Sequence, residues 1–80
     1  MIVRIVLWRL DASTPPVSEL RDRLDELEPL QPPSAFLVND SAERVGMLLV
    51  DDEDEPPPQL EELRRLVGRE PDLYEEFDAL

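Results

Sequence analysis

Ile2-Val3-Arg4-Ile5-Val6-Leu7-Trp8-Arg9-Leu10 decides the fold, because this stretch has the pattern of a β-strand that is apolar on both faces. Side chains alternate across a strand. One face therefore carries Ile2, Arg4, Val6, Trp8 and Leu10, and the other carries Val3, Ile5, Leu7 and Arg9. Residues 45–50, Val-Gly-Met-Leu-Leu-Val, are also apolar on both faces. A sheet with such strands has to be buried on two sides, so we expect a partner to cover the face that this chain's own helices leave bare.

Length and charge restrict the classes of protein to which the chain can belong. Its 80 residues suffice for a single domain, 1–80, and leave no material for a second core. Twenty acidic residues against eight arginines, with no lysine or histidine, give a net charge of -12. Because nucleic-acid binders and proteins of anionic membranes cluster basic side chains, we expect neither partner here.

Targeting and redox signals are also sparse. No apolar run approaches the roughly 18–20 residues of a membrane span, and Met1 leads directly into the first strand, so we expect a cytoplasmic protein. The absence of cysteine excludes disulfides and thiolate metal sites. The acidic run 51–55 lacks the alternate spacing and the turn glycine of a calcium loop, so we expect no metal site and no cofactor.

Two segments have the spacing of amphipathic helices. Ser13 and Thr14 precede a pair of prolines and suit a helix N-terminus, and leucines then recur at helical spacing up to Pro29, which predicts a helix over 15–28. The second apolar stripe runs from Leu60 to Val67 and is followed by Gly68, a residue typical of helix ends. We interpret Pro56-Pro57-Pro58 as a rigid start of this helix rather than as a polyproline ligand.

The remaining segments predict strands. Residues 34–38 and 45–50 are rich in β-forming residues, and the small polar residues between them suit a hairpin turn. The final segment, 71–80, fits either a short helix or a strand; a fourth strand beside the first completes a compact sheet, so we predict a strand. The predicted fold is an α+β sandwich of order β-α-β-β-α-β, with a four-stranded antiparallel sheet and two helices on one face.

This order is the ferredoxin-like arrangement. The opening strand 2–10, the hairpin 36–50 and the ending Tyr74-Glu75-Glu76-Phe77-Asp78 resemble the dimeric α/β-barrel superfamily, which includes antibiotic-biosynthesis-monooxygenase-like and stress-responsive barrel proteins. The resemblance covers nearly the whole chain and rests on order and pattern. It implies a homodimer in which two sheets pack through their bare faces, as the strands with two apolar faces had independently required.

Candidate site residues are few, because the chain has no histidine, cysteine or lysine. Arg4 and Trp8 share a strand face, and the aliphatic Val3, Ile5 and Leu7 of the opposite face suit packing against helices, so we expect Arg4 and Trp8 to point into the barrel. A guanidinium and an indole there would bind an anionic or aromatic small molecule, with Met47 and Tyr74 as further lining. The alternative is a structural role, in which Trp8 fills the dimer core and Arg4 pairs with an acidic residue of the neighbouring strand, Glu75 or Glu76.

Three functions are consistent with this pattern. The first is a homodimeric module that is non-catalytic or that binds a small apolar or aromatic molecule. The second, implied by the resemblance, is a cofactor-independent monooxygenase or isomerase that uses Arg4, Trp8, Tyr74 and a carboxylate. The third is an acidic protein-interaction module or a regulatory domain of the ACT type, which shares the same order of elements.

Overall fold

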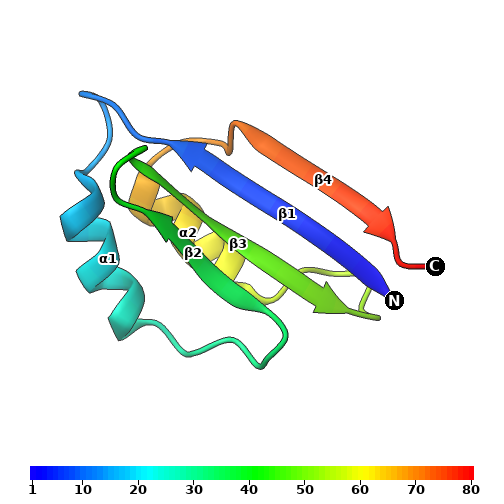
Figure 1. Cartoon of the computed structure of the whole chain (residues 1–80). Coiled ribbons are helices and arrows are strands. Elements are labelled where there is room, and N and C mark those ends of the chain that lie inside the picture. Colours follow the sequence, from blue (N-terminus) through cyan, green and yellow to red (C-terminus); the bar gives the residue numbers. More distant parts are fainter.

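The structure is a computed structural model of the whole chain, residues 1–80, and it has the predicted order of elements. The elements are β1 (Ile2–Arg9), α1 (Val17–Glu26), β2 (Ala35–Asn39), β3 (Arg44–Asp51), α2 (Pro58–Val67) and β4 (Leu73–Asp78). Every neighbouring pair of strands is antiparallel, and the sheet order is β2-β3-β1-β4, with β3 and β1 in the centre (Figure 1). This α+β arrangement is compatible with the ferredoxin-like fold.

The C-terminal segment forms the predicted fourth strand. All six residues of β4 lie opposite residues of β1, from Leu73 opposite Leu7 to Asp78 opposite Ile2. An isolated helix of this length is marginal in water, whereas alternate residues of an added antiparallel strand exchange backbone hydrogen bonds with β1. The strand interpretation of residues 71–80 is therefore confirmed for Leu73–Asp78.

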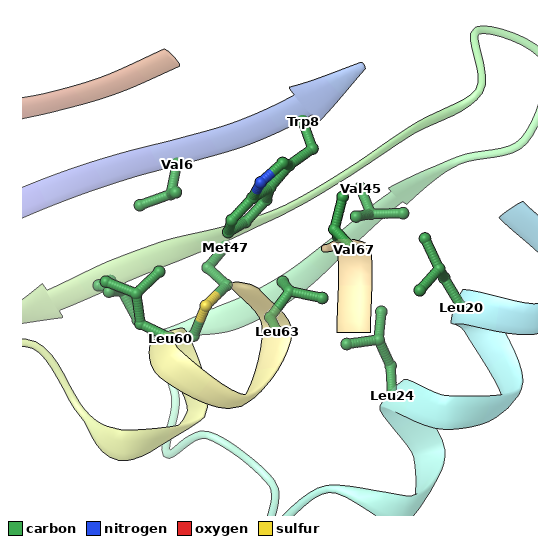
Figure 2. Close-up of a cluster of buried hydrophobic side chains, with 10 residues drawn as sticks. Val6, Trp8, Leu20, Leu24, Val45, Met47, Leu60, Leu63 and Val67 are labelled. Carbon is green, nitrogen blue, oxygen red and sulfur yellow. The ribbon is translucent and has the colours of Figure 1, made fainter. Parts of the chain in front are cut away.

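Both helices lie on the same face of the sheet and enclose one small core (Figures 1 and 2). Its buried apolar residues are Val6, Trp8, Leu20, Leu24, Val45, Met47, Leu49, Leu60, Leu63 and Val67. Only 13 of the 80 residues are buried. A chain of this size removes a modest share of its surface from water, so its stability as a single copy rests on few contacts.

The first helix is shorter than expected at both ends, since the sequence predicts a helix over 15–28 and α1 spans Val17–Glu26. Ser13 and Thr14 do not cap α1, because the Ser13 backbone N–H and hydroxyl donate to Asp11 Oδ1 at 2.8 and 2.6 Å, and the Asp11 N–H donates to Thr14 Oγ1 at 2.9 Å. These bonds form a turn before the helix, which begins at Val17. At the other helix, Gly68 ends α2 in the left-handed region with φ 89°, as predicted.

The predicted assignment of the two sheet faces is wrong. Arg4 and Trp8 lie on the face that the helices cover, and the aliphatic face with Ile5 lies on the other side. The register with β3 explains this result: Val45, Met47 and Leu49 lie opposite Trp8, Val6 and Arg4, and together they fill the core. Gly46 lies on the opposite face, where it offers the helices no side chain.

Candidate functional site

Arg4 is a buried arginine whose guanidinium forms four hydrogen bonds within the chain. Its side chain is 1% exposed. Nε donates to Glu76 Oε1 at 2.9 Å, Nη1 donates to Asp51 Oδ1 at 3.3 Å, and Nη2 donates to the backbone oxygens of Glu53 and Asp54, both at 2.9 Å. The predicted structural role of Arg4, a pairing with Glu75 or Glu76, is therefore confirmed for Glu76. The matching prediction that Trp8 fills a dimer core is wrong, because Trp8 is buried in the core of the single chain. Arg4 joins β1, β4 and the acidic loop after β3, and each of its three guanidinium nitrogens has a partner within the chain.

The charges of this cluster support one another. The hydrogen bond from Arg4, together with its positive charge, holds the pKa of Glu76 below its usual value. The same hydrogen bond raises the pKa of Arg4, so the guanidinium stays charged. The Tyr74 hydroxyl donates to Glu76 Oε1 at 3.3 Å, and burial, reinforced by the negative charge of Glu76, raises the pKa of Tyr74.

Trp8 has a structural partner as well. Its indole Nε1 donates to the backbone oxygen of Arg69 at 2.9 Å, and its ring lies in the core beside Met47 (Figure 2). Arg69 in turn donates from Nη1 to Asp11 Oδ2 at 2.9 Å and from Nη2 to the backbone oxygen of Arg9. Hydrogen bonds from the Ser13 side chain and from Arg69 lower the pKa of Asp11 to about 2. This network fixes the end of β1 against the segment that links α2 to β4.

The four predicted ligand contacts thus share one sheet face, but they do not line a cavity. Arg4, Trp8 and Met47 are buried beneath the helices, and Tyr74 is 41% exposed on the edge strand. None of the four borders any of the hollows in the surface. Their role as ligand contacts stays a prediction, and packing and internal hydrogen bonds account for the burial of the first three.

The sheet face opposite the helices, which we name the open face, is largely apolar. It is formed by Val3, Ile5, Leu7 and Arg9 of β1, Arg44, Gly46, Leu48 and Val50 of β3, Ala35, Leu37 and Asn39 of β2, and Leu73, Glu75 and Phe77 of β4. The aliphatic side chains are half-buried by their neighbours alone, and Phe77 is 48% exposed. No element of the chain covers this surface (Figure 1).

Gly46 lies in the centre of the open face, where β3 comes very close to β1. A Cβ atom at this position would lie 2.0 Å from the backbone oxygen of Val6 and 2.6 Å from Leu7 Cδ2. Any side chain here would push the two central strands apart. Glycine therefore keeps the middle of the open face flat and lets Leu7 lie over the backbone of β3.

Two arginines lie side by side at one end of the open face. Arg9 and Arg44 are directly opposite each other in the β1–β3 pair, and both are exposed. The other six arginines of the chain each form an ion pair within 4.0 Å, whereas Arg9 and Arg44 form none. Like charges placed directly opposite each other destabilise a sheet. In a chain with twenty acidic residues, this uncompensated pair is unexpected.

Two hollows adjoin the arginine pair. One, of about 330 Å³, is lined by Leu7, Arg9, Arg44, Asp72 and Leu73. The other, of about 270 Å³, is lined by Leu7, Leu37, Val38, Asn39, Arg44 and Val45. They share Leu7 and Arg44, so guanidinium groups and leucine side chains border the same small region.

The largest hollow, of about 880 Å³, lies elsewhere, between the connector that follows α1 and the start of α2. Its lining includes Glu28, Asp51 and Gln59. Gln59 Nε2 donates to the backbone oxygen of Glu28 at 3.2 Å, while its buried Oε1 has no partner. Because this Oε1 is enclosed and the lining is acidic without a free cation, we regard the end of the open face as the better candidate site.

Comparisons with known proteins gave no match that indicates a function. A scan against protein-family models gave no match, and a search of curated proteins found no relative. No cluster of side chains has the composition and spacing of a metal site, and no helix is long and apolar enough to cross a membrane.

Sequence reasoning missed the arginine pair. Arg9 closes the first strand and Arg44 opens the third, and only the β1–β3 register brings them together. A usable signal was present at Gly46, because an unbroken row of large apolar residues, Val45, Met47 and Leu49, identifies the core face of β3. The hairpin and antiparallel pairing then place Arg9 and Arg44 on the other face.

Proposed function

We propose that this protein is a homodimeric binding module of the dimeric α/β-barrel type, in which the open faces of two copies pack together around a small ligand with an apolar body. The observation that carries the proposal is the continuous apolar surface that crosses all four strands and that no helix covers. Such a surface is typical of an interface or of a ligand site.

The size of the open face supports association. Four strands about 4.8 Å apart, with about six residues each at about 3.3 Å, give it roughly 400 Å². Patches of about 300–600 Å² are the largest on typical monomers and are often functional. Two such faces would together remove about 800 Å² from water, worth at most about 20 kcal/mol at about 25 cal/mol per Å², against an association cost of roughly 4–15 kcal/mol.

The edge of the sheet offers a poorer surface for self-association. β4 is an exposed edge strand, and its sequence Leu-Tyr-Glu-Glu-Phe-Asp carries three acidic residues. Antiparallel pairing of two β4 strands would bring these carboxylates together, and charged edge strands normally prevent such pairing. The open face has no comparable concentration of negative charge, since Glu75 is its one acidic residue.

The small core of the single chain also favours a dimer, because association would bury further apolar surface. A single copy buries few residues, so the apolar surface of the open face is a large fraction of the hydrophobic stabilisation still available to it. Two sheets stacked about 10 Å apart would make a second core between the copies. Hollows beside Leu7 would then become enclosed, as a ligand site requires.

Disulfide trapping tests this interface directly, because the chain has no cysteine of its own. We expect Ile5→Cys or Leu48→Cys, placed in the middle of the open face, to form a covalent dimer under mild oxidation at micromolar concentration. Ser18→Cys, an exposed position on α1, is the matched control. Equal cross-linking of all three variants, or none in the two open-face variants, would contradict the proposed interface.

A second experiment addresses the ligand. Native mass spectrometry of freshly purified protein is expected to show a dimer with a small molecule retained, and that mass should disappear after denaturation and refolding. An empty dimer that binds no member of a panel of aromatic and aliphatic metabolites would contradict the ligand part of the proposal and leave only the homodimer.

A further inference from the structure

We propose that Arg9 and Arg44 bind the carboxylate of a small amphipathic acid whose apolar part lies on Leu7 and the leucines beside it. This inference rests on the proposed function, because the second copy would close the site. Its starting observation is the uncompensated pair of cations at the end of an apolar surface.

The two guanidinium groups have the chemistry that a carboxylate requires. Arginine presents a planar fork of N–H donors that matches the two oxygens of a carboxylate, and two adjacent arginines can share one anion. Both residues border the hollow of about 330 Å³ beside Leu7, and Arg44 also borders the second hollow. An anion bound in the first hollow would therefore also relieve the repulsion between the two arginines.

The backbone holds Arg9 in place for this role. Its N–H donates to Asp72 Oδ2 at 2.7 Å, and its carbonyl oxygen accepts a hydrogen bond from Arg69 Nη2. Asp72 borders the same hollow, but its carboxylate lies 3.7 Å from Arg69 Nη2 and already accepts the Arg9 N–H. The Asp72 carboxylate therefore interacts with the Arg69 guanidinium and with the Arg9 backbone N–H. It forms no ion pair with the side chain of Arg9 or Arg44.

The apolar half of the ligand follows from the rest of the lining. Leu7 borders both hollows, Leu73 borders one and Leu37 the other. Volumes of about 330 and 270 Å³ suit a short aliphatic chain or one aromatic ring rather than a large cofactor. The net charge of -12 does not prevent binding of an anion, because physiological salt screens exposed charges beyond about 8 Å and leaves the adjacent arginines to dominate.

The test uses octanoate as the probe, with octanol as its neutral isostere and inorganic phosphate as an anion without an apolar part. In NMR titrations of the whole protein, we expect octanoate to shift the amides of Leu7, Arg9 and Arg44 and to bind at least about tenfold more tightly than either comparator. If octanol binds as tightly as octanoate, the arginines do not contribute to binding. If phosphate binds as tightly as octanoate, the leucines do not contribute.

Variants separate this site from general charge effects. Arg9→Gln with Arg44→Gln is expected to weaken octanoate binding by at least about tenfold. Arg23→Gln with Arg65→Gln removes the same charge from two exposed helical arginines and should change the affinity by less than about twofold. Comparable losses in both double variants would overturn the assignment.

Light scattering on the same samples distinguishes the ligand site from the dimer. A dimer that does not prefer octanoate over octanol overturns the carboxylate site and leaves the proposed function standing. A monomer that still binds octanoate through Arg9 and Arg44 supports the site and contradicts the homodimer. If the arginine variants dissociate the dimer without changing octanoate binding, carboxylates of the second copy occupy the arginines and the ligand proposal fails.

Discussion

Arg4 Nε donates a hydrogen bond of 2.9 Å to Glu76 Oε1, across the pair of strands that joins the centre of the sheet to its edge. The two partners lie in different surroundings, since the Arg4 side chain is 1% exposed and that of Glu76 is 51% exposed. The charge of Arg4 is therefore stabilised mainly by its partners in the chain, whereas water can solvate the charge of Glu76.

Substitution of these two residues is expected to have unequal effects. Arg4→Met leaves the backbone oxygens of Glu53 and Asp54 without the Arg4 donor and removes the ion pair with Asp51, and it should lower the free energy of unfolding by about 3 kcal/mol. Glu76→Gln keeps an oxygen acceptor at an exposed position and should cost much less than Arg4→Met. Urea denaturation measures both values; equal losses would contradict this account of the cluster.

Asp11 predicts a pH dependence that can be followed residue by residue. Its pKa is lowered from 3.8 to about 2 in the folded chain, so the ionised form contributes stability above pH 3.8, and this contribution is lost as the pH falls towards 2. A ¹³C NMR titration of its carboxyl group should have a midpoint near 2. Ser13→Ala removes the largest cause of the shift and should move the midpoint towards 3.8; a wild-type midpoint near 3.8 would exclude the described network.

The two glycines should respond differently to alanine. Gly46→Ala places a methyl group against the backbone oxygen of Val6 and should destabilise the fold by about 3 kcal/mol, because the central strands must separate. Gly68→Ala meets no atom within 4 Å and should cost about 1 kcal/mol, from its left-handed backbone alone. Thermal denaturation monitored by circular dichroism gives the order, and a milder effect at Gly46 would refute the close approach of β3 and β1.

The arginine pair should lower the stability of the ligand-free protein. Removal of one charge, as in Arg44→Gln, relieves the like-charge contact with Arg9 and should raise the free energy of unfolding by about 0.2–1 kcal/mol at low salt. Arg65→Gln breaks a helical ion pair with Glu61 instead and should give no gain. The comparison requires one fixed protein concentration, and a loss of stability in Arg44→Gln would show that the pair is compensated within the chain.

The order of elements could be predicted from the sequence because each signal is local. Helical spacing of leucines, prolines before the helices and Gly68 after α2 identify the two helices, and the acidic C-terminal segment follows as a strand once the sheet has to be completed. The ion pair between Arg4 and Glu76 was foreseeable for a related reason, since a buried guanidinium in the middle of a strand requires an acid on a neighbouring strand.

The orientation of the sheet could not be read from β1 alone. Both of its faces are apolar, and the aliphatic Val3, Ile5 and Leu7 indicated the wrong face for the helices. Arg4 can lie on the covered face because Glu76 and Asp51 pair with it there. The arginine pair at Arg9 and Arg44 depends on cross-strand register, which joins residues distant in the chain. Packing against β3 decided the faces, and the register created the candidate site.

Sedimentation equilibrium of the wild-type chain tests the proposed homodimer most directly. At micromolar concentration we expect twice the 9.2 kDa mass of one chain, and we expect Ile5→Glu to reduce it to a folded species of 9.2 kDa, because a charge in the centre of the open face would be buried unpaired in the dimer. Ser18→Glu adds the same charge on α1 and should stay dimeric. A wild-type mass of 9.2 kDa across this range would contradict the sheet-to-sheet homodimer.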